Sequence, residues 1–386
     1  MANQTVDVVV VGGNAGAVIA HKLAELRYHV ALLWDKDIPG ATHTNQKWLH
    51  SGILYPSPAL AAKAWKNRKD DWKLKKQYLT GPGQAYFLAL NPETINDKVE
   101  MWQNWRDGGY DVPTFTELTS EDKTSLHKAN INFDNFAGGW VTPDCVIDFP
   151  SMVRDLRLSL EGTHCVMEGA KFLGLRHDSY GITVDVDWRG TPSTLSCKHC
   201  VLAAGAWSYE LLRNIGVRHL PLIRKKCPVL VIKRAALPVS QITVCLDVTK
   251  GDGTLGDVSL VPFYDEVLAA GTDFEEVTDL EDHRLQDLQC NGSEVEKLKT
   301  QLIQCFPKVR ELKADEYTWR TCFKFEQYNP DHPDVEPKIY TNERASETVG
   351  HGIPGLIVAL PGKASLMFDL AGQVAGVVKR EGGAAI

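Results

Sequence analysis

A glycine-rich turn near the N-terminus has the residue types and spacing of a phosphate-binding loop. It lies in the stretch VVVVGGNAGAVIA (8–20). The usual dinucleotide fingerprint is G-x-G-x-x-G, whose glycines let backbone N–H groups approach a pyrophosphate. Counted from Gly12, Asn14 and Ala17 replace the second and third glycines. Because Asn visits left-handed conformations more readily than most residues, we predict that this degenerate turn still binds phosphate groups.

Two other clusters of residues could do chemistry. Cys197 and Cys200 form a single C-x-x-C pair. A zinc site needs a second ligand pair, and none stands at a usable spacing, so we predict no metal site. Arg224, Lys225 and Lys226 form a basic cluster, which either attracts an anionic substrate or lies on a solvated surface.

The elements around the glycine turn are those that a dinucleotide site requires. The all-valine run 8–11 is typical of a parallel strand buried on both faces. Apolar residues then recur at helical spacing over 17–26, and HVALLW (29–34) predicts a second strand. A strand, a glycine turn, a helix and a strand follow one another in the order of the dinucleotide-binding unit. Asp35, directly after the second strand, is predicted to bind the ribose hydroxyls.

The rest of the chain alternates helical and strand patterns. Residues 58–78 predict a basic helix, and 275–316 are charged and predicted to be helical. The stretches 172–188 and 258–272 predict β-hairpins. Residues 355–380 predict a strand, a glycine turn and a closing helix. No proline-rich linker separates these segments, so we expect two lobes that are interleaved along the chain.

The composition excludes several classes of protein. The chain of 386 residues carries a formal net charge of −7, whereas nucleic-acid binders present basic surfaces. No apolar run approaches the roughly 20 residues of a membrane helix, and the first strand begins too early to leave room for a signal peptide. Nine cysteines without a framework spacing favour reduced thiols. We expect a cytoplasmic protein with no nucleic-acid partner and no membrane span.

Four stretches run along nearly the whole chain in a fixed order. They are the turn at 12–16, ATHTNQKWLHSGILYP (41–56), GGWVTPDCVIDFPSMVRDL (138–156) followed by VLAAGAW (201–207), and GLIVALPGKASLMFDLAGQVAG (355–376). This ordered set resembles the FAD-dependent D-amino-acid-oxidase superfamily, which includes sarcosine and glycine oxidases and relatives that oxidise 2-hydroxyglutarate or glycerol phosphate. The resemblance implies FAD rather than a nicotinamide, because the C-terminal LPGKA turn covers the flavin ring in this family.

The resemblance also implies a fold class and a domain organisation. The fold is α/β, with a Rossmann-like FAD-binding lobe interleaved with a substrate lobe on a mainly antiparallel sheet. We expect residues 1–80, 140–215 and 340–386 to form the FAD-binding domain, and 81–139 and 216–339 the substrate domain. The residues expected at the cofactor are Gly12, Gly13, Asn14, Ala15, Gly16, Asp35, Lys47, His50, Ala204, Gly205, Trp207, Cys322, Gly362, Lys363 and Ala364.

Two of these residues raise the question of a covalent flavin. In relatives, a histidine in the loop of His50 lies beside the flavin, and in some it is attached to the ring. Cys322 lies near the place of a flavin-linked cysteine in sarcosine-oxidase-like enzymes, but the following Pro330–Asp331 stands at a longer spacing than in that family. We expect non-covalent FAD, with a link through Cys322 or His50 as the alternative.

The resemblance assigns catalytic roles to Arg320, His50 and Lys363. Arg320 corresponds to an arginine that clamps a substrate carboxylate, for which a planar guanidinium is suited. Lys363, at the start of the last helix, would stabilise negative charge on the reduced flavin. The lysine that activates oxygen in sarcosine-oxidase-like enzymes is absent from VLAAG (267–271), so the electron acceptor, oxygen or another, stays open.

Three functions are compatible with these residues. The first is an enzyme that oxidises a small, anionic carboxylated amine or amino acid by hydride transfer to flavin. The second is a dehydrogenase of a 2-hydroxy acid or polyol phosphate, in which His50 takes the hydroxyl proton. The third is a flavin-bearing assembly protein without turnover, because a fold alone does not determine a function.

Overall fold

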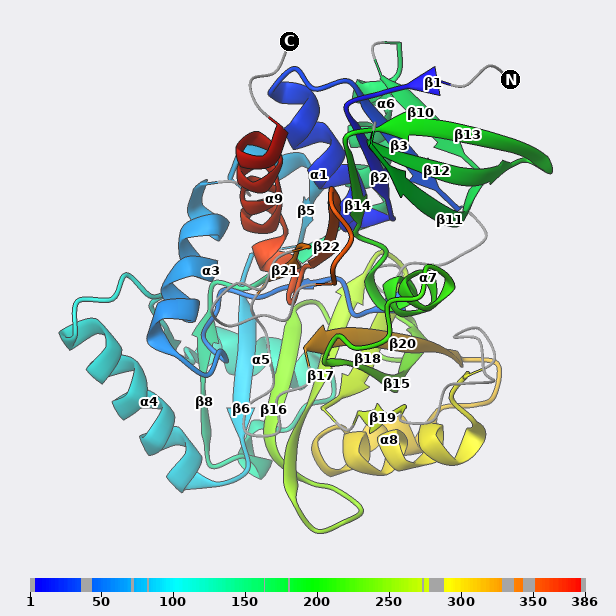
Figure 1. The fold of residues 1–386 in the computed structure, drawn as a ribbon. Coiled ribbons are helices and arrows are strands. Elements are labelled where there is room, and N and C mark those ends of the chain that lie inside the picture. The colour runs from blue at the N-terminus through cyan, green and yellow to red at the C-terminus, as the bar shows by residue number, and fades with distance from the viewer. Residues whose placement is uncertain are drawn as a thin grey trace.

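The computed structural model describes most of the chain, in ten segments. They are residues 4–35, 44–70, 73–81, 83–162, 164–179, 181–272, 274–277, 288–327, 337–342 and 351–382. Two sheets dominate these segments, one in the upper and one in the lower half of Figure 1. No described helix has both the length and the apolar character needed to cross a membrane.

The upper half is built on a six-stranded sheet whose first five strands run parallel. Its order is β10 (Cys165–Glu168), β3 (Val30–Trp34), β2 (Val8–Val11), β14 (His199–Leu202), β22 (Leu356–Leu360) and the antiparallel β21 (Lys338–Tyr340). All four valines of β2 are buried, and they alternate between two apolar clusters on opposite faces of the sheet. The all-valine run therefore forms the doubly covered strand that the sequence predicts.

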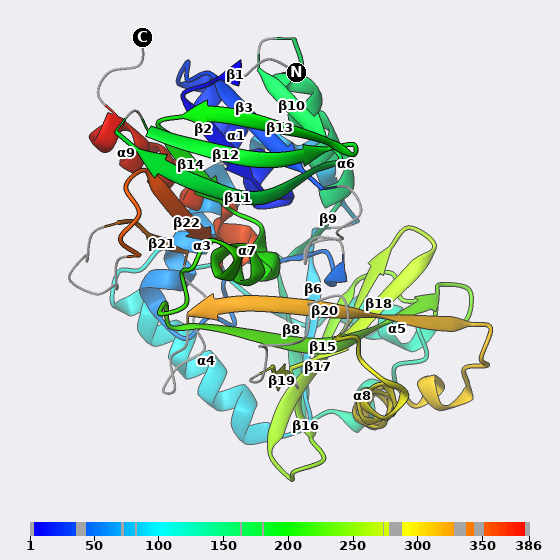
Figure 2. The same ribbon diagram turned by 45° about the vertical axis from the view of Figure 1, so that its right-hand side comes forward.

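Different layers cover the two faces of this parallel sheet. On one face α1 (Asn14–Glu25) packs against α6 (Phe149–Leu160) and α9 (Met367–Gly382). The other face carries a four-stranded sheet, in the order β1 (Gln4–Thr5), β13 (Thr191–Cys197), β12 (Gly181–Trp188) and β11 (Ala170–Asp178). Figure 2 shows this second sheet in front of the parallel one. The helix α7 (Ser208–Asn214) follows β14 after the short 3-10 turn η3 (Gly205–Trp207).

The lower half is built on a nine-stranded, mainly antiparallel sheet. Its order is β19 (Glu275–Glu276), β15 (Leu222–Lys233), β18 (Glu266–Gly271), β17 (Leu255–Phe263), β16 (Ile242–Thr249), β6 (Ala85–Ala89), β8 (Gly138–Thr142) and β7 (Thr116–Glu117), and β20 (Tyr317–Gln327) pairs with β15. Only the pair β6 and β16 is parallel among its described pairings. Figure 2 shows β20 at the boundary with the upper half, below α7.

The remaining elements surround these sheets. The helices are α3 (Pro58–Asp70), α4 (Pro92–Asp107), α5 (Ser120–Lys128) and α8 (Gly292–Cys305), with 3-10 turns η1 (Lys73–Tyr78), η2 (Phe133–Asn135), η5 (Pro307–Glu311) and η6 (Ala364–Leu366). A small sheet of β4 (Trp48–Leu49), β9 (Cys145–Ile147) and β5 (Leu79–Thr80) pairs three segments that are far apart in the sequence.

The predicted α/β class, with a parallel and an antiparallel sheet, is confirmed. Both predicted hairpins form, as β11–β12 and β17–β18. The prediction that 275–316 is helical is wrong at its start, because Glu275 and Glu276 form β19 opposite Lys226 and Lys225, where unlike charges favour pairing across strands. The basic helix predicted over 58–78 is divided into α3 and η1. The domain boundaries stay a prediction.

Candidate functional site

The glycine turn lies at the carboxyl edge of the parallel sheet, against the end of β14. Gly12 directly follows β2, with a φ of +155°. A Cβ atom at Gly12 would lie 2.3 Å from the carbonyl oxygen of Ala203, a distance that no side chain tolerates. The turn therefore requires glycine at position 12, because two strand ends approach each other there.

The start of α1 offers unused hydrogen-bonding groups beside this turn. The N-cap residue Gly13 provides no side-chain cap, and the first turn of α1 carries no acidic residue. Asn14 is 4% exposed, and neither its Nδ2 nor its Oδ1 atom has a hydrogen-bond partner among the described residues. A buried amide without partners is costly unless a ligand satisfies it. A helix N-terminus of this kind suits the pyrophosphate of FAD, so these residues fit the cofactor.

The ends of three other strands lie at the same edge of the sheet. Asp35 follows β3 and is partly buried. Ala204 follows β14, where its N–H donates to Ser208 Oγ at 3.1 Å, and Gly205 adopts a φ of +59°. Gly362, after β22, has a φ of +61°. In open α/β sheets, ligands bind at this edge, so the structure places these predicted residues where a dinucleotide would lie.

Several other predicted cofactor residues lie in, or directly before, the helical turns that follow these strands. Ala15 and Gly16 lie in the first turn of α1, and Trp207 ends the 3-10 turn η3. Lys363 is partly buried and directly precedes η6, which begins at Ala364. Pro330 and Asp331 lie outside the described residues.

A buried carboxylate that sequence reasoning missed holds the segment containing His50. Asp144 is 1% exposed and accepts four hydrogen bonds. The donors are Trp48 Nε1 at 2.9 Å, Ser51 N at 2.8 Å, Ser51 Oγ at 2.9 Å and Thr142 Oγ1 at 2.5 Å. The only signal was an acid in the sequence TPDC (142–145), between the short strands β8 and β9 and within the stretch 138–156 that carries part of the family resemblance. Asp144 therefore fixes the Trp48 side chain and the Ser51 backbone, which lie on either side of His50 in the chain.

The imidazole of His50 is packed and held in an uncharged state. Its ring stacks on Trp48, with 3.9 Å between ring centroids. Burial, followed by the positive charges of Lys363 and Lys324, holds the pKa of His50 well below its usual value. The structure therefore brings His50 close enough to Lys363 for the two residues to interact electrostatically.

One face of β20 carries the predicted substrate anchor and the predicted cysteine. Arg320, Cys322 and Lys324 alternate along the strand and so point to the same face. The Arg320 Nη2 atom donates to the carbonyl of Asn45 at 3.4 Å, and its buried Nε atom has no partner among the described residues. The Nε–H group of Arg320 is therefore a donor that no described residue uses.

Cys322 lies directly opposite Cys227 of β15, and both side chains are buried. A hydrogen bond from the Cys227 thiol, followed by the charge of Lys324, lowers the pKa of Cys322 to about 7. This environment favours the thiolate form of Cys322 more than that of an ordinary buried cysteine.

The basic cluster that begins at Arg224 does not form a solvated surface. Arg224 is 1% exposed, and its guanidinium lies 4.5 Å from the ring centroid of Tyr209. Lys226 pairs with Glu294 at 3.2 Å and with Glu275 at 3.5 Å. Successive residues of a strand point to opposite faces, so Arg224 and Lys226 point away from the face that carries Cys227. The expectation of a solvated cluster is therefore wrong for Arg224, which is packed in the interior.

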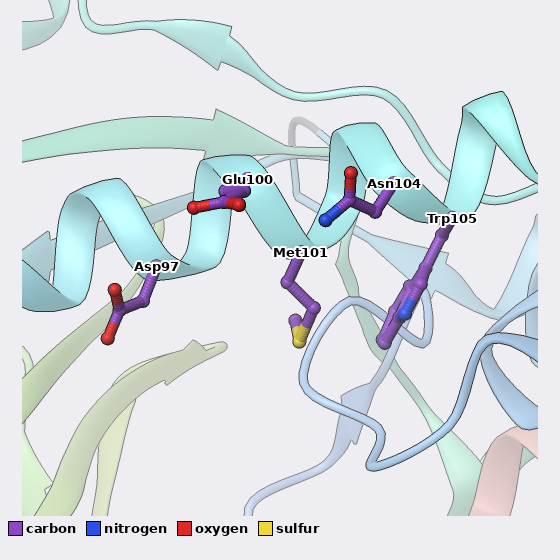
Figure 3. A pocket seen from close by; sticks show the side chains of 5 residues that line it. All are labelled: Asp97, Glu100, Met101, Asn104 and Trp105. Atoms are coloured by element: carbon purple, nitrogen blue, oxygen red, sulfur yellow. The ribbon is translucent and has the colours of Figure 1, made fainter.

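A surface pocket lies on α4. It has a volume of about 350 Å³ and is lined by Asp97, Glu100, Met101, Asn104 and Trp105. Figure 3 shows that all five side chains come from this single helix. None of the predicted site residues lines it, so the pocket is not the candidate site.

Comparison with known proteins gives a family and a fold. Residues 7–365 match the family model described as FAD dependent oxidoreductase. Glycine oxidase of Geobacillus kaustophilus (strain HTA426) is 25% identical over 293 residues, which cover 69% of this chain and 73% of that protein.

Two solved structures show the same fold at low identity. NikD, described as an unusual amino acid oxidase essential for nikkomycin biosynthesis, has a TM-score of 0.73 at 18% identity, and the match covers 100% of this chain and 96% of the NikD chain. Glycerol-3-phosphate dehydrogenase from Bacillus halodurans complexed with FAD has a TM-score of 0.71 at 17% identity. The match spans 98% of this chain but 65% of that dehydrogenase.

Proposed function

This chain belongs to the FAD dependent oxidoreductase family, and from that membership we propose that it oxidises a small amine that carries a carboxylate, such as an amino acid. The observation that supports this substrate class is the position of Arg320. Its partly buried guanidinium lies beside Asn45, with Nε unpartnered among the described residues. A partly buried guanidinium, whose N–H donors lie in one plane, can bind both oxygens of a carboxylate.

In this proposal, different residues of the site bind the cofactor and orient the substrate. Bound FAD supplies the acceptor for the hydride that leaves the substrate carbon. Gly12, Gly13 and Asn14 bind its pyrophosphate, and Asp35 binds its ribose. Arg320 holds the substrate carboxylate and so orients the carbon that bears the nitrogen. Lys363 contributes positive charge near His50, at the end of the site where negative charge develops.

A hydroxy acid or polyol phosphate is the less favoured substrate class. Oxidation of an alcohol requires a base to take the hydroxyl proton, and His50 is the residue that the resemblance offers. Burial and the charges of Lys363 and Lys324 hold the pKa of His50 well below its usual value. His50 is therefore a weaker base than an ordinary histidine, and this favours the amine.

The proposal is tested by mixing the purified holoenzyme with single substrates in the absence of oxygen. The amines are glycine, N-methylglycine, D-alanine and L-proline, and the alcohols are glycolate, D-2-hydroxyglutarate and glycerol 3-phosphate. We expect at least one amine to bleach the flavin absorbance and the alcohols to leave it unchanged. Bleaching by the alcohols alone would support the hydroxy-acid alternative, and no bleaching by any compound would overturn the proposed function.

We predict that the FAD is not covalently attached. The Cys322 thiol is hydrogen-bonded by Cys227 and Thr44, and the His50 ring is stacked on Trp48, so both side chains are already engaged within the protein. Acid precipitation should therefore release yellow FAD into the supernatant. Yellow colour retained in the pellet would contradict this, and the variants Cys322→Ala and His50→Ala would then identify the attachment point.

We also propose a reducing compartment such as the cytoplasm for this protein. All nine cysteines are free, although Cys227 and Cys322 face each other on neighbouring strands. Thiols so placed persist where the surroundings are reducing.

A further inference from the structure

Two cysteines face each other across the strand pair β15 and β20. Cys227 of β15 is the direct partner of Cys322 of β20 in the antiparallel register, so both side chains lie on the same face of the sheet. Opposite residues of an antiparallel pair have Cα atoms about 4.5 or 5.5 Å apart, and a disulfide spans Cα distances of roughly 4.4–6.8 Å. The backbone therefore already holds the two cysteines at a separation that a disulfide can bridge.

A third cysteine approaches β20 from the opposite face. The N–H of Cys290 donates to Thr321 Oγ1 at 2.7 Å. Thr321 and Cys322 are neighbours in the strand, so their side chains point to opposite faces. Cys227 is therefore the cysteine that shares a face with Cys322.

The surroundings of Cys322 leave a route for a small molecule. Cys322 is 6% exposed, but Arg320 and Lys324, its neighbours on the same face of the strand, are partly exposed. The segment that crosses this face contacts it through polar groups, since the Thr44 hydroxyl is hydrogen-bonded to Cys322 and the Asn45 carbonyl accepts from Arg320 at 3.4 Å. A small polar oxidant therefore meets long side chains and polar groups at this thiol, and not a closed apolar core.

The two thiols differ in acidity. The hydrogen bond from Cys227, followed by the charge of Lys324, lowers the pKa of Cys322 to about 7, whereas that hydrogen bond and burial raise the pKa of Cys227 well above its usual value. Lys47 adds to the effect on Cys322; it is 2% exposed, and burial and the charge of Arg320 lower its own pKa to about 7. Cys322 is therefore the more nucleophilic member of the pair at neutral pH.

We propose that Cys227 and Cys322 are a peroxide-reactive pair that forms a reversible disulfide in the holoenzyme. The oxidant is hydrogen peroxide. In the first step the Cys322 thiolate attacks one peroxide oxygen, the O–O bond breaks, and the departing hydroxide takes up a proton to give water, which leaves Cys322 as a sulfenic acid.

The second step closes the disulfide. The sulfur of Cys227 attacks the sulfenic sulfur of Cys322, the S–O bond breaks, and the hydroxide leaves as water with the proton of the Cys227 thiol. The two thiols together lose two electrons and two protons, and one peroxide is reduced to two molecules of water.

The test is differential labelling of the nine cysteines after the holoenzyme is treated with hydrogen peroxide and the excess is removed with catalase. Free thiols are blocked in denaturant with N-ethylmaleimide, disulfides are reduced with dithiothreitol, and the released thiols are blocked with deuterated N-ethylmaleimide. Peptide mass spectrometry should find the deuterated label at Cys227 and Cys322 and the light label at the other cysteines. Light label at both positions after treatment would overturn the proposal.

Three other cysteines serve as internal controls. Cys165 is the only one of the nine that is not buried, but its partners in the sheet are not cysteines and burial raises its pKa. Cys245 and Cys305 interact with each other, but they are 0% and 1% exposed within an apolar cluster. Oxidation of Cys165 alone, or labelling of Cys245 and Cys305 equal to that of the proposed pair, would overturn the assignment of a specific reactive pair.

Single variants test the order of the two steps. Cys227→Ser keeps a hydrogen-bond donor for Cys322 but cannot close a disulfide, so Cys322 should gain two oxygen atoms and dithiothreitol should not restore it. In Cys322→Ala, Cys227 should stay a free thiol, because burial still disfavours its thiolate. Unmodified Cys322 in Cys227→Ser would overturn the assignment of Cys322 as the attacking thiol.

The labelling needs neither a substrate nor reduction of the flavin. Its outcome is therefore independent of the amine test, in which no bleaching by any compound would overturn the proposed function alone. The wild-type protein decides whether the disulfide forms, even where a variant does not fold. Dithiothreitol should return the treated wild-type protein to light label at Cys227 and Cys322, and failure to do so would overturn the reversible disulfide.

Discussion

Arg320→Ala will lower kcat/KM for a carboxylated amine by roughly 10²- to 10³-fold. Removing one partner of a desolvated charge pair costs about 2–5 kcal/mol, because the other charge is left buried without a partner. Arg320 is partly buried and already uses Nη2 to contact the Asn45 carbonyl, so its position is fixed before the substrate binds. The loss should also appear in kcat if the anchor aligns the reacting carbon.

Two further variants of arginine make this prediction specific. Arg320→Lys keeps the charge but loses the two-pronged donor geometry, so it should remain clearly impaired. Arg176→Lys, at an arginine of β11 whose side chain is 69% exposed, should leave the kinetics unchanged. FAD content should be the same in all three proteins. If Arg320→Ala oxidises the substrate as well as the parent, the anchor is elsewhere, and Lys324 on the same face of β20 is the next residue to test.

Asp144→Ala will destabilise the protein by about 3 kcal/mol or more, because it leaves several buried donors without an acceptor. The four donors come from Trp48, Ser51 and Thr142. Asp144→Asn retains the shape but turns an NH₂ group toward these donors, so it should restore only part of the loss. Urea unfolding of the holoenzyme measures the change.

The matched control for Asp144 is an exposed aspartate. Asp134→Ala, in η2 on the surface, should change the free energy of unfolding by no more than about 0.5 kcal/mol. Asp144→Ala should also alter the flavin spectrum, because the carboxylate holds the backbone beside His50. An Asp144→Ala protein as stable as the parent would show that the network around the carboxylate is not what holds this segment.

Local pattern was sufficient to predict the parallel sheet and its glycine turn. The all-valine run 8–11, the helix after it and the strand ending before Asp35 are adjacent in the sequence, so their spacing alone indicates how they pack. The same reasoning failed at Glu275–Glu276, where two charged residues suggested helix. Their structure depends on the lysines of β15, some 50 residues earlier in the chain.

The candidate site was less accessible to sequence reasoning, since long-range packing creates it. Arg320 and His50 could be proposed only through the family resemblance, and their roles stay predictions. Asp144 was missed because its four donors lie on two segments, one of them 93 residues away. The low pKa of Lys47 depends on burial and on Arg320, 273 positions later in the numbering. No local sequence motif indicates the environment of Asp144 or of Lys47.

The packing of α1 against α9 has a consequence for how the chain folds as it is made. Helix α1 carries the turn that fits the FAD pyrophosphate, yet one of its packing partners is the last described helix. At 5–20 residues per second, the ribosome needs roughly half a minute to reach that partner. During that time the apolar face of α1 and the open edge of β14 lack α9 and β22. The upper half therefore cannot finish folding until α9 has been synthesised, and before then the nascent chain exposes an aggregation-prone surface that chaperones would have to cover.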